Sequence, residues 1–188
     1  MAEKRERPRA VLFDRDGTLV VDVPYNGDPD KVVAMPTVAV SVRMLREAGI
    51  RLGVVTNQSG IGRGIISAQD VDRVNRRIDS KFGPFDVWQV CPHVPEDNCR
   101  CRKPMPGMIL EASKRLGVEP GEIAVFGDIG ADVQAALAAG ATPVLIPTAQ
   151  TRVEEVRSAP HVASTVSDAV ALLFVDARDA KPARSAAE

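Results

Sequence analysis

Residues 10–18 read AVLFDRDGT, an apolar run of four residues followed directly by a polar cluster. A short, uninterrupted apolar run is typical of a strand that is buried on both faces of a parallel sheet. Asp14 and Asp16 stand two residues apart at the end of this run, and Gly17 allows the chain to turn sharply after them. The motif therefore predicts a buried strand that presents two carboxylates at its carboxyl end.

Segments with strand and helix character alternate along the rest of the chain. The strand-like segments are short, and the segments between them carry apolar residues at helical spacing. This order is typical of an α/β domain with a single doubly wound parallel sheet and helices on both of its faces. Strands are expected at residues 10–13, 51–55, 86–90, 123–126 and 143–146, with a weak one near 161–163. Helices are expected at residues 36–48, 67–82 (capped by Ser67), 106–116, 131–139, 150–158 and 166–175.

The chain length of 188 residues predicts one domain. Hydrophobic residues make up 45% and charged residues 26%, as in ordinary globular proteins, which excludes a disordered or collagen-like chain. We expect a charged N-terminal arm over residues 1–9, a folded domain over residues 10–175 and a disordered tail over residues 176–188.

The net charge of −1 at pH 7 gives no broad attraction for nucleic acid or for an anionic membrane. No apolar run approaches the ~18 residues that a membrane span needs. The N-terminal residues are charged and lack the apolar core of a signal sequence. A cytoplasmic monomer that binds neither nucleic acid nor a membrane is therefore expected.

The residues that follow the expected strands are candidates for a functional site, because ligands of open α/β sheets bind beyond the carboxyl ends of the strands. Thr56 follows the second strand, Lys103 lies beyond the third, and Asp128 follows the fourth. Several carboxylates at one edge would repel one another without a hard cation, and Mg²⁺ prefers oxygen ligands. One aspartate could then attack a phosphorus atom while the other handles the proton of the leaving group. The alternative interpretation is that Asp14 and Asp16 only mark a turn.

Three cysteines and a histidine lie within one segment of eleven residues. An odd number of cysteines so close together is a poor disulfide framework, whereas three sulfurs and one imidazole make a complete tetrahedral set for Zn²⁺. Because four protein ligands leave no open position, the zinc is expected to be structural. The alternative is a group of buried thiols beside a surface histidine. The candidate ligands are Cys91, His93, Cys99 and Cys101.

Four motifs, in this order and spacing, resemble those of the haloacid-dehalogenase-like phosphohydrolases. They are DRDGT at residues 14–18, TNQSG at 56–60, RKP at 102–104 and GDxxxD at 127–132. The resemblance extends over roughly residues 10–147 and implies a Rossmann-like sheet of the haloacid-dehalogenase type. Cap domains of this superfamily are inserted after the first or third strand, where residues 20–35 and 91–105 leave room only for loops. No large cap domain is therefore expected.

The resemblance also implies roles for the residues of these motifs. Asp14 would be the nucleophile that forms an aspartyl-phosphate, and Asp16 would act first as the general acid and then as the general base. Asp128 would bind Mg²⁺ together with Asp14 and the backbone carbonyl of Asp16. Thr56 and Lys103 would hold the phosphoryl group.

Residues 91–103 are similar to the zinc loops of two subgroups of this family, the D-glycero-D-manno-heptose 1,7-bisphosphate phosphatases and the histidinol-phosphate phosphatases. TNQSGIGRG at residues 56–64 looks like the heptose form, so the resemblance implies removal of the C7 phosphate from a small phosphorylated sugar. A histidinol-phosphate phosphatase, a 3′-phosphatase of nucleic-acid ends and a non-catalytic zinc module are the alternatives. Asp132 is expected to orient Lys103 or a metal-bound water. The implied substrate contacts are Asp22, Tyr25, Asn57, Gln58, Ser59, Arg63 and Arg102.

Overall fold

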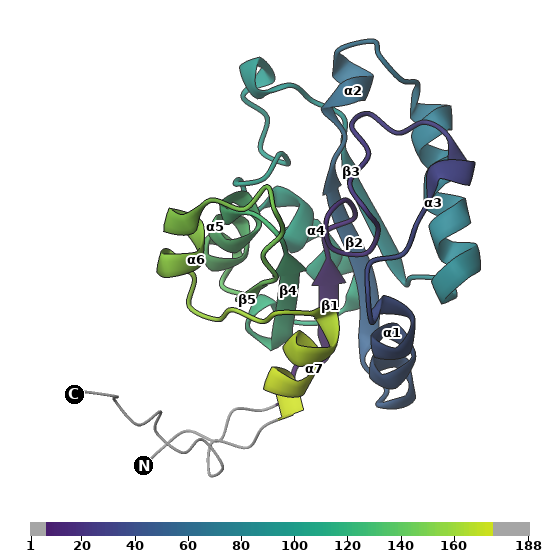
Figure 1. Cartoon of the computed structure of the whole chain (residues 1–188). Coiled ribbons are helices and arrows are strands. Elements are labelled where there is room, and N and C mark those ends of the chain that lie inside the picture. Colours follow the sequence, from purple (N-terminus) through teal and green to yellow (C-terminus); the bar gives the residue numbers. More distant parts are fainter. Residues whose placement is uncertain (1–6, 175–188) are drawn as a thin grey trace, which may run out of the picture.

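A single parallel sheet organises the protein, whose computed structural model describes residues 7–174. Within these residues, five strands lie in the order β3-β2-β1-β4-β5, and every neighbouring pair is parallel (Figure 1). The predicted doubly wound α/β fold is thus confirmed, whereas the predicted tail over residues 176–188 lies outside the described residues. The strands are β1 (Ala10–Phe13), β2 (Arg51–Asn57), β3 (Val87–Cys91), β4 (Ile123–Gly127) and β5 (Thr142–Leu145).

The helices follow the expected segments closely. They are α1 (Val38–Glu47), α2 (Ser59–Gly62), α3 (Ala68–Phe82), α4 (Gly107–Leu116), α5 (Gly130–Ala139), α6 (Val153–Ser158) and α7 (Val166–Phe174). The sequence did not predict α2 or the short 3₁₀ turns Pro29–Lys31, Pro95–Asp97 and Pro120–Glu122. The weak strand expected near residues 161–163 was wrong, because only a single bridge between Leu145 and Val162 forms there. None of the described helices is long and apolar enough to cross a membrane.

The two faces of the sheet are covered by different helices. Along β1, Val11 and Phe13 point into a core with α1, α3 and α7, whereas Ala10 and Leu12 point into a second core with α4 and α5. This alternation follows from the two-residue period of a strand, and it explains why the run at residues 10–13 is apolar without interruption. The ring of Phe13 packs edge-on against that of Phe126, with 5.4 Å between the ring centroids.

Helix ends are fixed by the residues expected to fix them. Ser67 caps α3, because its hydroxyl accepts a hydrogen bond from the backbone N–H of Asp70 at 3.1 Å and the Asp70 carboxylate binds back to the N–H of Ser67. The last turn of α4 ends at Gly117, which has a φ of 61° and therefore adopts the left-handed conformation that glycine accommodates best. The capped helices α3 and α4 pack on opposite faces of the sheet.

The strand order creates one crevice at the carboxyl edge of the sheet. After β1 the chain continues to β2 and β3 on one side, and it then crosses to β4 and β5 on the other side. The arrowhead of β1 in Figure 1 points to the edge where α2 and the long connections lie. The switch in direction between β1 and β4 is where ligands of such folds bind. In the described chain, residues 14–37 and 92–106 contain loops, 3₁₀ turns and two isolated bridges, Asp16–Val20 and Val20–Ala34, so no large cap covers the crevice.

Candidate active site and metal centre

A cavity of about 430 Å³ opens beyond the carboxyl ends of β1, β2 and β4. It brings together most of the residues that the sequence singled out, although they come from segments more than a hundred residues apart. The backbone of Asp14 is tied directly to β4, because its N–H donates to the carbonyl oxygen of Phe126 at 2.8 Å. The predicted site residues that line the cavity are Asp14, Asp16, Asp22, Tyr25, Thr56, Asn57, Gln58, Ser59 and Asp128.

Lys103 is buried beneath this cavity between two aspartates. Its Nζ donates to Oδ1 of Asp14 at 2.7 Å and to the carbonyl oxygen of Val55 at 2.8 Å, and it lies 2.5 Å from Oδ1 of Asp132. Burial lowers the pKa of Lys103, but the charges of Asp132 and Asp14 outweigh burial and raise the pKa above its ordinary value. Lys103 is therefore a fixed positive charge next to the expected nucleophile.

Asn57 holds the backbone of Lys103 in place. Its Nδ2 donates to the carbonyl oxygen of Lys103 at 3.1 Å, and its Oδ1 accepts from the N–H of Lys103 at the same distance. This reciprocal pair joins the end of β2 to the loop that precedes α4. Asn57 was expected to contact substrate; in the structure both polar atoms of its amide bind Lys103.

The carboxylates at the cavity floor are crowded. Burial, together with the charges of Asp132 and Asp16, raises the pKa of Asp14 to about 8 against the opposing effect of Lys103. Burial and Asp132 likewise raise the pKa of Asp128 to about 7. Oxygen atoms of Asp14, Asp128 and Asp132 all lie within 4.8 Å of one another. Buried carboxylates that repel one another are stabilised in their charged form by a hard divalent cation such as Mg²⁺, so this set of oxygen ligands fits such a cation.

Gly17 makes the close approach of these carboxylates possible. A Cβ atom added at this position would lie only 2.3 Å from Oδ2 of Asp128, and the φ of 82° is a conformation that other residues rarely adopt. The glycine that was expected to permit a turn after Asp16 is thus also required by the packing of Asp128 against the loop.

Sequence reasoning missed a pair of threonines that hold Asp128. The hydroxyl of Thr148 donates to Oδ2 of Asp128 at 3.3 Å, and the hydroxyl of Thr151 donates to its backbone carbonyl oxygen at 2.5 Å. Both residues lie in the turn between β5 and α6, which explains why α6 begins at Val153 and not at residue 150. The rule that directs attention to residues after each strand would have found Thr148 if it had been applied to the fifth strand.

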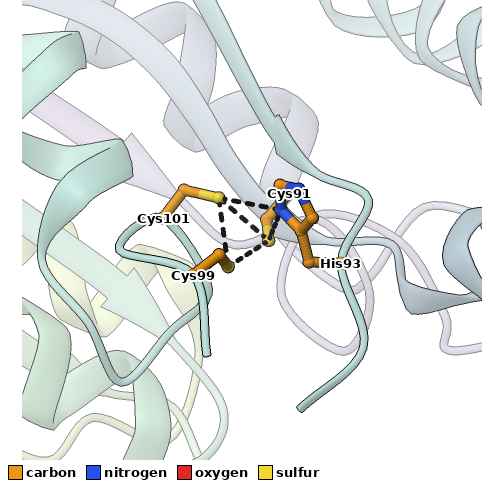
Figure 2. A group of neighbouring side chains, drawn as sticks. All are labelled: Cys91, His93, Cys99 and Cys101. Carbon is orange, nitrogen blue, oxygen red and sulfur yellow. Dashed lines mark hydrogen bonds between the residues drawn. The ribbon is translucent and has the colours of Figure 1, made fainter. Parts of the chain in front are cut away.

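A second ligand cluster lies at the end of β3 and in the loop that leads from it to α4. Figure 2 shows the side chains of Cys91, His93, Cys99 and Cys101 turned toward a common centre. The three sulfurs are 3.2 to 3.7 Å apart, and Nδ1 of His93 lies 3.2 Å from the sulfur of Cys101. A tetrahedron with metal–sulfur bonds of about 2.3 Å has edges near these lengths. The donor set therefore fits Zn²⁺ in both chemistry and geometry.

The local backbone supports this metal centre. Burial raises the pKa of Cys99, but hydrogen bonds from the N–H of Arg102 and from neighbouring thiols outweigh burial and lower this pKa to about 7. The lower pKa favours the thiolate, which is the form that binds metal. The N–H of Gly107 donates to the carbonyl oxygen of Arg100 at 3.1 Å. A Cβ atom at Gly107 would lie 2.3 Å from that oxygen, so the start of α4 needs glycine to pack against the loop.

Two arginines that were expected to contact substrate lie outside the main cavity. Arg102 lines a separate depression of about 270 Å³ together with Cys99 and Lys103, and its Nη1 donates to the carbonyl oxygen of His93 at 3.3 Å. Arg63 is exposed at the end of α2. The cavity with the aspartates and these two cations are therefore neighbouring but distinct features of the surface.

Proteins with similar sequences and structures include several phosphatases. The model of the HAD-hydrolase-like family matches residues 100–173. D-glycero-beta-D-manno-heptose-1,7-bisphosphate 7-phosphatases from Bordetella bronchiseptica and Rhodopseudomonas palustris are 33% and 37% identical, over 77% and 74% of this chain and 83% and 84% of their own length. A similar solved structure is the crystal structure of the D,D-heptose 1,7-bisphosphate phosphatase from B. bronchiseptica, complexed with magnesium and phosphate. It superimposes with a TM-score of 0.78 and 26% sequence identity, and the match covers 88% of this chain and 97% of that one. The chain belongs to the haloacid-dehalogenase-like hydrolases and, within them, to the phosphatases.

Proposed function

We propose that this protein is a Mg²⁺-dependent phosphomonoesterase that removes the C7 phosphate from D-glycero-D-manno-heptose 1,7-bisphosphate. The observation that carries the reaction type is the buried array in which Lys103 joins Asp14 and Asp132, with Asp16 at the rim of the same cavity. The names of the relatives support the sugar substrate. We assign the activity to a domain over residues 10–175, acting as a cytoplasmic monomer on a small phosphorylated sugar without nucleic-acid or membrane partners.

Two metal ions are part of this proposal. Asp14, Asp128 and the backbone carbonyl of Asp16 would hold Mg²⁺, which supplies positive charge to the oxygens of the transferring phosphoryl group. Asp132 remains bound to Lys103 and orients it. Zn²⁺ in the loop over residues 91–103 would be structural, because its four ligands leave no open position for substrate.

The chemical steps follow from the positions of two aspartates. A carboxylate oxygen of Asp14 attacks phosphorus and forms an aspartyl-phosphate while the bond to the sugar oxygen breaks. Asp16 gives its proton to that leaving oxygen. Asp16 then takes a proton from water, whose oxygen attacks phosphorus, and the bond to Asp14 breaks to release inorganic phosphate. The hydroxyl of Thr56, and Lys103 once it releases its bond to Oδ1 of Asp14, would bind the non-bridging oxygens through both steps.

Recognition of the sugar is assigned to the rim of the cavity and to the zinc loop. Asp22, Tyr25 and Ser59 lie on the rim where the hydroxyls of a sugar would enter. Burial and the charge of Asp16 raise the pKa of Asp22, and a sugar hydroxyl that donates to this carboxylate would satisfy it. Arg102 and Arg63 would bind the phosphate that remains on the sugar, and the bond from the N–H of Arg102 to the sulfur of Cys99 ties that arginine to the metal centre.

The proposal is tested by phosphate release from a matched set of substrates with and without Mg²⁺. The set contains both anomers of heptose 1,7-bisphosphate, fructose 1,6-bisphosphate, histidinol phosphate and a 3′-phosphorylated oligonucleotide. We expect a heptose bisphosphate to be preferred by about 100-fold in kcat/KM, a difference of roughly 2.7 kcal/mol in transition-state binding. Preference for histidinol phosphate or the oligonucleotide would reject the sugar assignment. No turnover of any ester with Mg²⁺ would reject the enzymatic proposal itself.

A further inference from the structure

A buried arginine lies between the two aspartates of the proposed mechanism and has no role in it. Arg15 is only 1% exposed, and it is among the largest fully buried side chains of the described residues. Burying a guanidinium group is costly unless its N–H donors are paired. The hydrogen-bond partners of Arg15 therefore indicate the role of its side chain, and this inference rests on the proposed function.

Arg15 directs two side-chain N–H donors at the carboxylate of Asp16. Its Nε and Nη2 lie 3.0 and 2.9 Å from the same carboxylate oxygen, Oδ2 of Asp16. The carbonyl oxygen of Arg15 also accepts hydrogen bonds from the N–H groups of Leu19 and Val20, both at 3.0 Å. Backbone and side chain of Arg15 are thus both fixed. The planar guanidinium can form this fork, and a lysine at the same position could not.

The contacts of Asp16 are concentrated on one of its two oxygens. Oδ2 accepts from Arg15 twice and from Nε2 of Gln58 at 2.8 Å. Within residues 7–174, no hydrogen-bond donor is directed at Oδ1 of Asp16, although the residue lines the cavity where substrate would bind. The carboxylate is therefore held by one oxygen, while the other is left to exchange a proton with the substrate.

Asn75 connects this arrangement to a rigid element. Its Oδ1 accepts from Nη1 of Arg15 at 3.1 Å across 60 residues of sequence, and its side chain is 8% exposed. Asn75 lies on α3, which is anchored by its Ser67 cap and by Val74 and Ile78 in the core. Asn75 lines a cavity of about 400 Å³ between α3 and β3, and it is not among the residues that line the cavity with the aspartates.

We propose that Asn75 and Arg15 form a positioning relay that holds Asp16 with Oδ1 directed at the oxygen of the leaving group. Asn75 fixes the guanidinium plane from α3, and the guanidinium fixes the carboxylate plane of Asp16. Asn75 does not line the cavity, and Arg15, which does, directs its side-chain donors to Oδ2 of Asp16 and to Asn75, so both are assigned as positioning residues. The relay matters for the step in which Asp16 delivers a proton, and it does not matter for the attack of Asp14.

This division predicts a dependence on the leaving group. A sugar or alkyl phosphate releases a strongly basic alkoxide that needs a proton from the acid, whereas p-nitrophenyl phosphate releases a stabilised phenolate that leaves without one. The parameter to compare is kcat/KM, because it reports the first phosphoryl transfer and not the later hydrolysis of the aspartyl-phosphate. A defect in the relay therefore lowers kcat/KM for the alkyl ester and largely spares the aryl ester.

The variants are chosen to separate positioning from folding. Asn75→Leu removes the acceptor at similar volume and should lower kcat/KM on the alkyl ester about tenfold, with less than about a threefold loss on the aryl ester. Asn75→Asp keeps an acceptor oxygen at the same place and should restore the ratio of the two substrates. Arg15→Met should shift that ratio by about 100-fold, and adding Asn75→Leu to it should cause no further shift, because Asn75 acts through Arg15. Val74→Ala, a core change on the same helix, is the control and should leave the ratio unchanged.

A measurement without substrate tests the relay independently of activity. Hydrogen exchange at the Nε–H of Arg15, followed by NMR, should be slow in the wild type and in Asn75→Asp and faster in Asn75→Leu. Equal losses on both esters in Asn75→Leu, additive shifts in the double variant, or unchanged Nε–H exchange would overturn the proposal. If the wild type hydrolyses neither ester, the proposed function fails, and the relay fails with it as a catalytic device even where the exchange result holds.

Discussion

The two ligand clusters of this protein are assembled in opposite ways. The oxygen cluster takes Asp14 from the end of β1, Asp128 from the end of β4 and Asp132 from α5, so its members meet only when the sheet forms. The sulfur and nitrogen cluster takes Cys91 from the last residue of β3 and its other three members from the loop that follows. The first is a product of tertiary structure, whereas the second is local in sequence.

This difference determines what each metal has to do. The oxygen cluster is held by backbone pairing of β1 with β4, by Lys103 and by the threonines around Asp128, so we expect its backbone framework to remain when the cation is removed. The loop has only a short 3₁₀ turn of regular structure, so we expect a bound metal to be what organises it. We therefore expect damage to the first cluster to abolish chemistry without unfolding, and damage to the second to release local structure.

The largest effect is expected from Asp14→Asn. The amide cannot attack phosphorus, so turnover should fall at least about 10³-fold. The strand pairing of β1 and the metal content of the loop should be unchanged, because neither uses the side-chain charge of Asp14. Phosphate release, circular dichroism and zinc analysis on one preparation check this. Substantial turnover in this variant would refute the mechanism, and loss of zinc would refute the independence of the two clusters.

Loss of one zinc ligand should have a smaller effect on turnover. Cys101→Ser is expected to lower zinc content and to reduce kcat/KM by about 10- to 100-fold, because Lys103 follows the loop directly. Hydrogen exchange should accelerate over residues 91–103 and stay unchanged in β1. Glu96→Ala, an exposed change in the same loop that spares all four ligands, is the matched control. Unfolding of the whole sheet would contradict the view that this cluster is local.

Acidification should weaken Mg²⁺ binding. In the metal-free protein, burial raises the pKa of Asp14 to about 8 and that of Asp128 to about 7, so both hold their protons to a higher pH than an ordinary aspartate. Mg²⁺ must displace those protons wherever the pH is below these values. Its apparent affinity should be highest above pH 8 and should fall by about tenfold per pH unit for each displaced proton as the pH drops below 7. Calorimetric titrations between pH 6 and pH 9 measure this, and a constant affinity across that range would contradict it.

The smallest effect is expected at the turn that holds Asp128. Thr148→Val removes the hydrogen bond to Oδ2 of Asp128 at nearly constant volume and should weaken Mg²⁺ or Mn²⁺ binding by roughly tenfold at most. The fold should remain intact, and Thr148→Ser should recover most of the affinity because it restores the hydroxyl. Mn²⁺ binding followed by electron paramagnetic resonance gives the dissociation constants. Equal affinities for Thr148→Val and the wild type would show that the Thr148 hydroxyl does not position the carboxylate of Asp128.

The sheet and the longer helices could be predicted because their signals are local. The apolar run at residues 10–13 coincides with β1, and the caps at Ser67 and Gly117 lie where helix chemistry puts them. The helix α2 could not be predicted, since Ser59–Gly62 contains two glycines and is held by a bond from the N–H of Gly62 to the carbonyl oxygen of Pro92. That bond exists only after β3 has joined β2.

The residues of the candidate site also fall into those that local sequence predicts and those that only tertiary contacts identify. Asp14 and Asp128 could be proposed because each follows a strand directly, and Asp16 because it lies two residues after Asp14 in the same motif. The roles of Arg15 and Asn75 could not be proposed. Arg15 lies inside the quoted motif, but Asn75, the residue on α3 that it contacts, is 60 residues away in the sequence. The support of Asp128 by Thr148 likewise spans 20 residues and needs the position of β5. Motifs therefore identified the reacting groups, and tertiary contacts identified what holds them.

The local build of the zinc loop has a consequence for inheritance and transfer. We expect the zinc cluster to be transferable between related sheets as one segment that begins with the last residue of β3, whereas the oxygen cluster requires the whole domain. The close contact of Gly107 with the carbonyl oxygen of Arg100 sets the length of the transferable unit. A graft that ended at the last cysteine would meet a side chain at the start of the next helix. The smallest portable piece therefore runs from Cys91 through Gly107.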